Sequence, residues 1–165
     1  MVITGNGAGS LKYWRFSTHK LMCKPVPLDE GIRQMSLHRD NGLLAVATAD
    51  FSVLVVDTVS RRTVRRFDSC HSDQITDFCF SPDCRWVLTA SLDSTVKVWD
   101  VPSGCLVDHV AFPRPVTSLT MSPANDRLAT THVGDLGVYL WVNKTLYGHV
   151  PLKPLTQDFL PRLAI

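Results

Sequence analysis

The sequence predicts an all-β fold, a β-propeller fragment of about three and a half four-stranded antiparallel blades. Three observations support this prediction. Segments of the chain match one another at offsets of 41 to 43 residues, the period of a propeller blade. Apolar residues alternate with polar ones inside each segment, which is typical of half-buried strands. Turn signals such as Ser81-Pro82-Asp83 separate the alternating runs.

Residues 70–100 form the most complete of these segments. The run begins with Cys70-His71 and ends with Trp99-Asp100, so it resembles a WD40 repeat, whose signature is G-H…W-D. In WD40 repeats a histidine, a Ser or Thr, an Asp and the Trp form a buried hydrogen-bonded tetrad. The residues that match are His71, Thr89, Asp93 and Trp99. Each of them would be costly to bury without a partner, so the resemblance gives them a structural role.

A hydrolase site at His71, Ser72 and Asp73 is the catalytic alternative. Three adjacent loop residues do not produce the geometry in which a base contacts a nucleophile and a third group orients the base. The structural interpretation is therefore favoured, and the sequence offers no other set of catalytic residues. We expect no enzymatic activity, no cofactor and no small-molecule substrate.

Two segments precede the central one. Residues 1–24 are expected to be a partial blade, in which Trp14 aligns with Trp99 and Thr4 with Thr89. Its turn lacks the aspartate, because Ala8 stands at that position. Residues 25–68 are expected to be a degenerate blade. There Asp50 is the only tetrad residue that remains, so apolar packing, not a polar tie, should hold this blade together. Residues 24–27 are expected to be a connector.

The central blade is expected to span residues 69–110, and the next one residues 111–150. In that blade Trp141, Thr131 and Asp135 align with Trp99, Thr89 and Asp93. The upstream half matches at an offset of 41 and the downstream half at 42, which predicts one inserted residue in the turn at 124–126. Residues 146–150 are expected to be its outer strand, and residues 151–165 a tail.

Four arginines make the densest basic cluster of the chain, on the outer strand expected at residues 60–67. These are Arg61, Arg62, Arg65 and Arg66. Charges on an edge strand prevent pairing with other chains, and this interpretation is favoured. The alternative is contact with RNA phosphates or with an acidic partner, and the cluster alone does not decide between them.

Composition excludes several classes of protein. The chain has 165 residues and a net charge of +2, which gives no global electrostatic reason for binding nucleic acid or a membrane. No apolar run is long enough to span a bilayer, and the N-terminus lacks the pattern of a signal peptide. Five cysteines, with no C-x-x-C pair, indicate free thiols in a reducing compartment. A zinc site at Cys70, His71, Cys79 or Cys84 is disfavoured, because the repeat already explains those positions.

Beyond the general signature, the chain resembles one WD40 family: the large WD40 subunit of the small-subunit processome, associated with the U3 small nucleolar ribonucleoprotein in the UTP-B subcomplex. The most specific runs are Trp99 to Leu106 (WDVPSGCL) and the stretch from Thr131-His132-Val133 to Tyr139-Leu140-Trp141. Further runs are residues 35–42, 49–52, 80–86 and 151–155. The resemblance covers nearly the whole chain up to about Leu155.

This resemblance implies the last blades of a second propeller and a non-catalytic scaffold in the nucleolus of the nucleus. The scaffold would act in ribosome biogenesis, in the assembly of the particle that processes pre-rRNA to 18S RNA. The implied partners are other WD40 subunits of UTP-B and the U3 particle, and the sequence does not decide whether RNA is contacted directly. A generic WD40 adaptor for protein interactions is the alternative. Since propellers close with four to eight blades, we expect this chain to be a fragment that self-associates or is partly molten in isolation.

Overall fold

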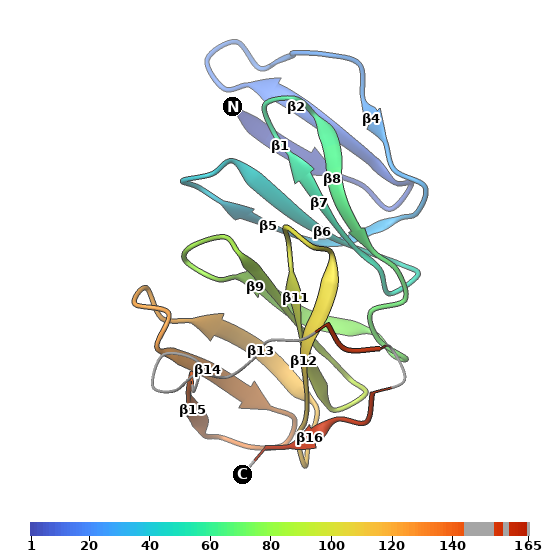
Figure 1. The fold of residues 1–165 in the computed structure, drawn as a ribbon. Helices are drawn as coiled ribbons and strands as arrows, with labels where there is room; N and C mark the ends of the chain where they lie inside the picture. The colour runs from blue at the N-terminus through green and yellow to red at the C-terminus, as the bar shows by residue number, and fades with distance from the viewer. Residues whose placement is uncertain (144–153, 157–158, 165) are drawn as a thin grey trace. The chain divides into compact units, whose positions relative to one another are not determined.

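The computed structural model describes residues 1–143, 154–156 and 159–164, and Figure 1 shows their course. The described residues form strands and turns, and among them there is no helix that could cross a membrane. The fold is an all-β propeller fragment whose blades are antiparallel sheets. The chain divides into two compact units, Met1–Asp68 and Ser69–Ile165, and each unit holds two sheets.

The first sheet of unit 1 consists of β1 (Val2–Gly5), β2 (Ser10–Arg15), β3 (Lys20–Leu21) and β4 (Val26–Pro27). Strand β2 lies in the middle, with β1 on one side and the two short strands on the other. Residues 24–27 were expected to be only a connector, and this expectation is wrong. Leu11 of β2 pairs with Val26 of β4, because β3 covers only the far end of β2 and leaves its first residues open for pairing.

The second sheet of unit 1 has the order β5 (Ile32–His38), β6 (Leu43–Thr48), β7 (Val53–Asp57) and β8 (Arg62–Phe67). It packs on the first sheet through an apolar core. The buried members of this core are Leu11, Tyr13, Leu44, Val46, Leu54 and Val56. Val46 and Val56 stand where the central blade has Thr89 and Trp99, so apolar packing does replace those two tetrad residues here. Burial of each such side chain contributes about 1.5–3 kcal/mol.

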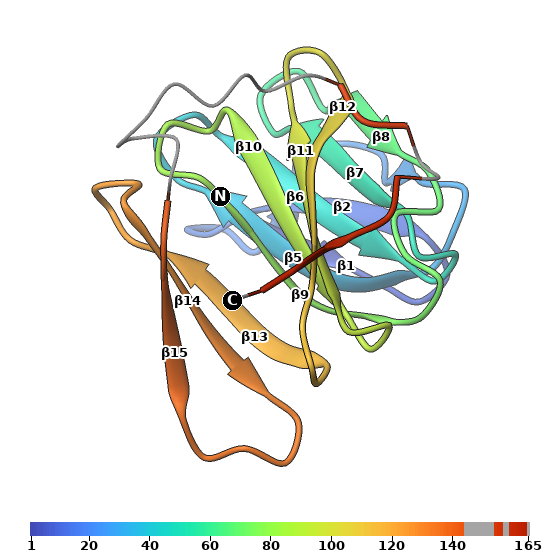
Figure 2. The same ribbon diagram turned by 60° about the horizontal axis from the view of Figure 1, so that its bottom comes forward.

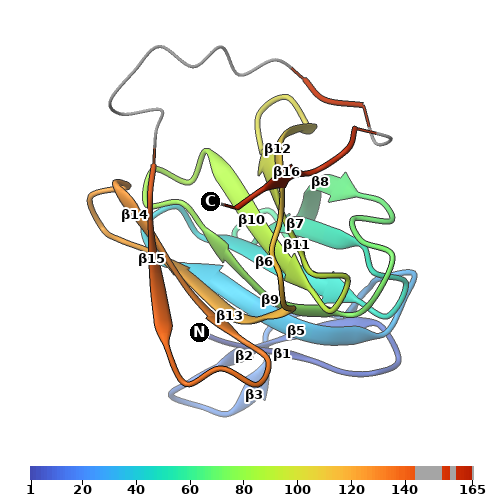
Figure 3. The ribbon, with the colours of Figure 1, turned by 90° about the horizontal axis from the view of Figure 1, so that it is seen from below.

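The first sheet of unit 2 contains β9 (Ile75–Phe80), β10 (Trp86–Ser91), β11 (Thr95–Asp100) and β12 (Cys105–Ala111). The tail adds a fifth strand, β16 (Arg162–Leu163), which runs parallel to β12 at the edge of the sheet (Figure 3). Residues 151–165 were expected to be a tail without a place in the repeat pattern. The edge carbonyls of β12 explain the docking of the tail, since Ala164 N donates to Ala111 O at 2.9 Å and Leu155 N donates to Leu106 O at 2.8 Å.

The second sheet of unit 2 contains β13 (Val116–Met121), β14 (Arg127–His132) and β15 (Val138–Val142), visible as the orange hairpins of Figure 2. The outer strand expected at residues 146–150 lies outside the described residues. The two sheets of unit 2 share a core whose buried members are Trp86, Leu88, Ala90, Val96, Phe112, Val116 and Leu119. Trp141 packs against this core and links it to the polar groups described below.

Candidate functional sites of the blades

The central blade brings together the four polar residues that the WD40 resemblance singles out. His71 Nε2 lies 2.8 Å from Thr89 Oγ1, and His71 Nδ1 lies 3.0 Å from Asp93 Oδ2. Trp99 Nε1 donates to the same threonine oxygen at 3.2 Å. Thr89, His71 and Trp99 are all buried, so the polar atoms of this tetrad find their partners inside the blade.

Asp93 receives more hydrogen bonds than the tetrad alone would supply. Thr95 donates to Asp93 Oδ1 through its hydroxyl at 2.7 Å and through its backbone N–H at 2.9 Å. Ser72 N donates to Asp93 Oδ2 at 3.2 Å. Burial acts to raise the pKa of Asp93, but the hydrogen bonds from His71 and Thr95 outweigh it and hold this pKa well below its ordinary value of 3.8. The carboxylate is therefore ionised and fully engaged in the turn.

In the first blade Trp14 Nε1 donates to Thr4 Oγ1 at 2.9 Å, so the structure places these two predicted residues together. The missing turn aspartate has a substitute that the alignment did not find. Asn6 Oδ1 accepts from Ser10 N at 2.9 Å and from Ser10 Oγ at 3.2 Å. The short polar side chain of Asn6 thus closes the β1–β2 turn two residues before the position expected for the aspartate.

The degenerate blade keeps a polar tie that was not expected. Asp50 accepts from Thr48 Oγ1 at 2.5 Å and from Ser52 Oγ at 3.0 Å, and Arg66 Nη2 lies 3.1 Å from Asp50 Oδ2. Thr48 and Ser52 are both buried. Burial opposes ionisation of Asp50, but the hydrogen bonds from Thr48 and Ser52 lower its pKa below the ordinary value. The prediction that packing alone holds this blade is wrong, because the turn between β6 and β7 still needs a capping carboxylate.

In the fourth blade the threonine predicted for the tetrad is displaced by one residue. Trp141 Nε1 donates to Thr130 Oγ1 at 2.8 Å, and Thr130 Oγ1 lies 2.9 Å from His132 Nε2. Thr131 instead contacts Thr117 Oγ1 at 2.8 Å on the other face of the sheet. The assignment of Thr131 is wrong, because the inserted residue lies in the β14–β15 turn and not in the turn at 124–126. Residues of β14 therefore match the central blade at an offset of 41 throughout.

The Asp135 side chain is not hydrogen-bonded to the side chains of Thr130, His132 or Trp141, all of which the structure describes. Its carboxylate accepts from the Tyr139 hydroxyl at 2.5 Å, whereas His132 Nδ1 lies 3.1 Å from the backbone oxygen of Arg114. The hydrogen bond from Tyr139 lowers the pKa of Asp135 below its ordinary value and raises that of Tyr139. His132 thus supplies the imidazole that Phe112 cannot, from a strand instead of from the loop that carries His71.

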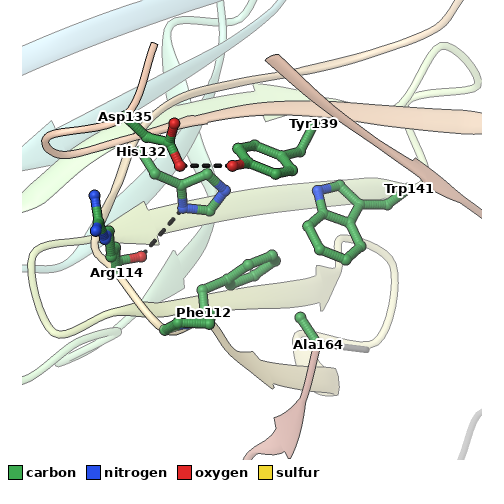
Figure 4. Close-up of a pocket in the computed structure, with 8 residues that line it drawn as sticks. Phe112, Arg114, His132, Asp135, Tyr139, Trp141 and Ala164 are labelled. Atoms are coloured by element: carbon green, nitrogen blue, oxygen red, sulfur yellow. Dashed lines mark hydrogen bonds between the residues drawn. The ribbon is translucent and has the colours of Figure 1, made fainter. Parts of the chain in front are cut away.

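An aromatic pocket of about 250 Å³ lies around these residues (Figure 4). Phe112 meets Trp141 edge-on with ring centroids 5.2 Å apart, and His132 meets Tyr139 in the same manner at 5.2 Å. Arg114 and Asp135 supply one charge of each sign at its margin, and Ala164 of the tail completes the lining. Such a pocket can receive an apolar or aromatic side chain, since the rings of Phe112, Tyr139 and Trp141 line it.

The four clustered arginines have different environments. Arg66 contacts the carboxylates of Asp29, Asp50 and Asp68, so it serves the fold of its blade. The Arg61 guanidinium lies over the ring of Tyr13, 5.6 Å from the centroid. Arg65 is half-buried on β8, while Arg62 is exposed at the start of that strand. The cluster is therefore not one uniform surface: Arg66 is paired with carboxylates, whereas Arg62 is exposed and forms no salt bridge among the described residues.

The cysteines and histidines do not assemble into a metal centre within the described ranges 1–143, 154–156 and 159–164. All five cysteines are free thiols. Burial, followed by the nearby Asp77 carboxylate, raises the pKa of Cys79 to about 12, so this thiol stays protonated and packs as a small apolar side chain.

The repeat geometry shows propeller blades, and the comparison with known proteins shows their family. The model of the WDR36/Utp21 second beta-propeller domain matches residues 1–165, the whole chain. The chain belongs to the WDR36/Utp21 family. The described blades are accordingly blades of the second propeller of WDR36/Utp21 proteins.

Three full-length members of the WDR36/Utp21 family are similar to the chain. Human WD repeat-containing protein 36 is 42% identical over 165 residues, which are 100% of this chain and 18% of that protein. The U3 small nucleolar RNA-associated protein 21 homolog of Schizosaccharomyces pombe is 39% identical over 96% of the chain and 17% of its own length. U3 small nucleolar RNA-associated protein 21 of Saccharomyces cerevisiae is 37% identical over 95% of the chain and 16% of its own length. The chain thus spans less than a fifth of each of these relatives.

Proposed function

We propose that this chain acts as a non-catalytic scaffold in ribosome biogenesis, within the small-subunit processome that processes pre-rRNA to 18S RNA. The proposed location is the nucleolus, and the proposed partners are the U3 particle and other WD40 subunits of UTP-B. One observation carries this proposal: the family match covers the whole chain, and two similar full-length proteins bear the name of an association with U3 small nucleolar RNA.

The polar groups of the blades support a non-catalytic role. Thr89 is shared by His71 and Trp99, and Asp93 is shared by His71, Thr95 and Ser72. A nucleophile or general base must remain accessible to a substrate, whereas these groups are hydrogen-bonded to one another. They are therefore proposed to stabilise the blades, which present loops and edges to partners.

The aromatic pocket of unit 2 is proposed as a contact point for a protein partner. Its rings are partly accessible, since Tyr139 is 40% exposed, and Arg114 and Asp135 flank it. Partly exposed Tyr and Trp side chains are enriched at the centres of protein interfaces. A partner side chain seated there would contact β15, the β12–β13 loop and Ala164, which follows the tail strand.

Affinity capture tests this function. The tagged chain is expressed in human cells, captured, and probed for U3 small nucleolar RNA, pre-rRNA and WD40 proteins. Tagged human WD repeat-containing protein 36 serves as the positive control, and an unrelated WD40 chain serves as the negative control. We expect enrichment of U3 RNA with this chain above the negative control. Capture of U3 RNA by the positive control alone contradicts the proposal, and capture of a different complex favours a generic adaptor.

A further inference from the structure

Three blades close their outer hairpins with the same turn, and this turn needs one residue in the left-handed region. The residue's N–H donates to the carbonyl four positions earlier: His19 to Arg15 O at 2.9 Å, Arg61 to Asp57 O and Gly104 to Asp100 O, both at 2.8 Å. Their φ angles are +51°, +60° and +76°. Glycine adopts this conformation at little cost, whereas a side chain there is strained. Unit 1 has His19 and Arg61 at the turn position where unit 2 has Gly104.

The residue that begins this turn differs in the same way. Asp100 Oδ2 accepts from Ser103 N at 3.0 Å, and Asp57 Oδ1 accepts from Val59 N at 2.9 Å, so each aspartate caps its own turn. The first blade has Arg15 at this position, after Trp14, so the signature Trp-Asp has become Trp-Arg. The substitution reverses a charge and removes the turn's cap.

Arg15 also faces a second positive charge. It pairs directly with Lys20 across the β2–β3 hairpin, whereas Asp57 of the next blade pairs with Arg62, its opposite in charge. Like charges directly opposite each other destabilise an antiparallel pair. Protection of a sheet edge does not explain Arg15, because β2 is paired on both sides.

No carboxylate neutralises this hairpin in the part of the chain that the structure describes. The first 28 residues contain four Lys and Arg residues and no Asp or Glu. The salt bridges among the described residues include Arg66, Arg85, Arg127 and Arg162, but neither Arg15 nor Lys20. Both side chains are exposed, so their charges are available to an anionic ligand.

The outer hairpin of the second blade extends this charge. The Arg61 guanidinium lies 5.6 Å from the ring centroid of Tyr13, on β2, so the turn between β7 and β8 adjoins the end of β2. Arg62 is exposed beside it, and the Asp57 carboxylate is occupied by the amides of Val59 and Ser60. Together these residues form what we call the basic hairpin surface: Arg15, Phe16, His19, Lys20, Arg61 and Arg62.

An exposed aromatic ring stands among these charges. Phe16, at the tip of the β2–β3 hairpin, is 72% exposed, and its ring centroid lies 6.4 Å from that of His19. An acidic protein surface would need only the charges. Aromatic side chains interleaved with Lys and Arg are instead typical of surfaces that bind single-stranded nucleic acid, where bases stack on the rings.

We propose that the basic hairpin surface binds single-stranded RNA, with phosphates on Arg15, Lys20 and Arg62 and a base stacked on Phe16. The choice of RNA as the ligand rests on the proposed function, and the position of the surface rests on the geometry alone. On this proposal, His19 and Arg61 in left-handed turns and the like-charge pair of Arg15 and Lys20 have a function. They place five basic groups and one ring at one end of unit 1.

Fluorescence anisotropy with a labelled oligouridylate of about 20 nucleotides tests this proposal on the purified chain. Arg15→Asp restores the capping aspartate, so it should fold at least as well as the wild type while binding weakens about ten-fold. The salt dependence of log Kd should become shallower by about 0.7 for each phosphate that the variant no longer binds. Phe16→Ala, at an exposed site, should weaken binding about five-fold or more.

Arg33→Asp is the matched control, because Arg33 is exposed and lies on β5 outside the basic hairpin surface. Equal weakening by Arg33→Asp and Arg15→Asp overturns the proposal, since it shows binding by net charge alone. Equal affinity for a polyglutamate of the same length, unaffected by Phe16→Ala, also overturns it in favour of an acidic protein partner. Thermal unfolding of each variant confirms that the compared chains are folded.

Capture from cells separates this proposal from the proposed function. If wild type and Arg15→Asp both capture U3 RNA while the purified chain does not bind the oligouridylate, the scaffold function stands and the basic hairpin surface is refuted. If the purified chain binds RNA through this surface but captures no U3 RNA, the surface stands and the proposed function is refuted.

Discussion

Single residues show where a repeat signature predicts contacts and where it fails. In the central blade the full tetrad marks His71, Thr89 and Asp93, and the structure joins them by hydrogen bonds. In the fourth blade two adjacent threonines fit the alignment equally well. Because successive strand side chains point to opposite faces, an error of one residue moves the hydroxyl to the wrong side of the sheet. The pairing of Trp141 with Leu128 and the hydrogen bond from Trp141 Nε1 decide for Thr130.

Thr130→Val is therefore expected to destabilise the chain, and Thr131→Val is not. Thr130 is 1% exposed and is the acceptor for Trp141 Nε1, so valine leaves that half-buried N–H without its partner. The expected decrease is about 1–3 kcal/mol of unfolding free energy. Urea denaturation of both variants measures it. A larger decrease for Thr131→Val would restore the register that the alignment predicted.

Because the pKa of Asp93 is lowered in the folded chain, the stability of the chain should depend on pH. Its pKa in the folded chain lies below the ordinary value of 3.8, so the unfolded chain binds this proton more readily. The stabilisation is fully present above the ordinary value and is lost as the pH falls toward the lowered one. Asp93→Asn should cost about 1.5–3 kcal/mol at pH 7, and the difference from wild type should shrink at pH 3. Urea denaturation at both pH values checks this, and an unchanged difference would contradict it.

The left-handed turn residues predict a gain and a loss of stability at equivalent positions. His19→Gly should raise the unfolding free energy by up to about 1 kcal/mol, because glycine adopts φ of +51° without strain. Gly104→Ala, at φ of +76°, should lower it by about 1 kcal/mol. Thermal unfolding compares the two. Destabilisation by His19→Gly would show that the imidazole stabilises the turn by more than the strain costs.

Among the elements, the long strands were predictable and the short ones were not. Alternation marks β9 and β11, because six residues suffice to display a period of two, and turn residues on both sides mark β10, whose six residues are all buried. Strands β4 and β16 have two residues each, which display no period. Their pairing is dictated by unpaired backbone groups on β2 and β12, and a sequence does not reveal which edges are left open.

A backbone hydrogen bond beside β16 holds the tail strand on β12. Ala164→Pro removes the N–H that donates to Ala111 O, so β16 should detach from β12. Residues 159–164 should then be cleaved faster in limited proteolysis, while the thermal transition of the sheet moves little. Leu160→Ala, at an exposed site, is the control and should leave the cleavage rate unchanged. Equal cleavage of Ala164→Pro and wild type would show that the tail is not held by this hydrogen bond.

For the molecule as a whole, the repeat period predicted the all-β propeller class, because each blade repeats one pattern of strands and turns. It did not predict the aromatic pocket. That pocket forms because Phe112 replaces a histidine and because Ala164 comes from the tail, two facts that lie outside any single repeat. The repeat period also did not predict the positive charge of the β2–β3 hairpin. Arg15 stands out only when it is compared with Asp57 and Asp100 at the equivalent turns.

Strand β15 has exposed apolar side chains along one face. Val138, Leu140 and Val142 alternate along this strand on one face and are 66%, 62% and 59% exposed. Contiguous exposed apolar side chains favour association, so the isolated chain should sediment as concentration-dependent oligomers. The double variant Val138→Lys and Leu140→Lys should shift the chain toward the monomer, because burying a lysine ammonium against a second copy is costly. Val59→Lys, at a lone exposed valine, should not. A wild-type chain that sediments as a monomer at all concentrations would contradict this prediction.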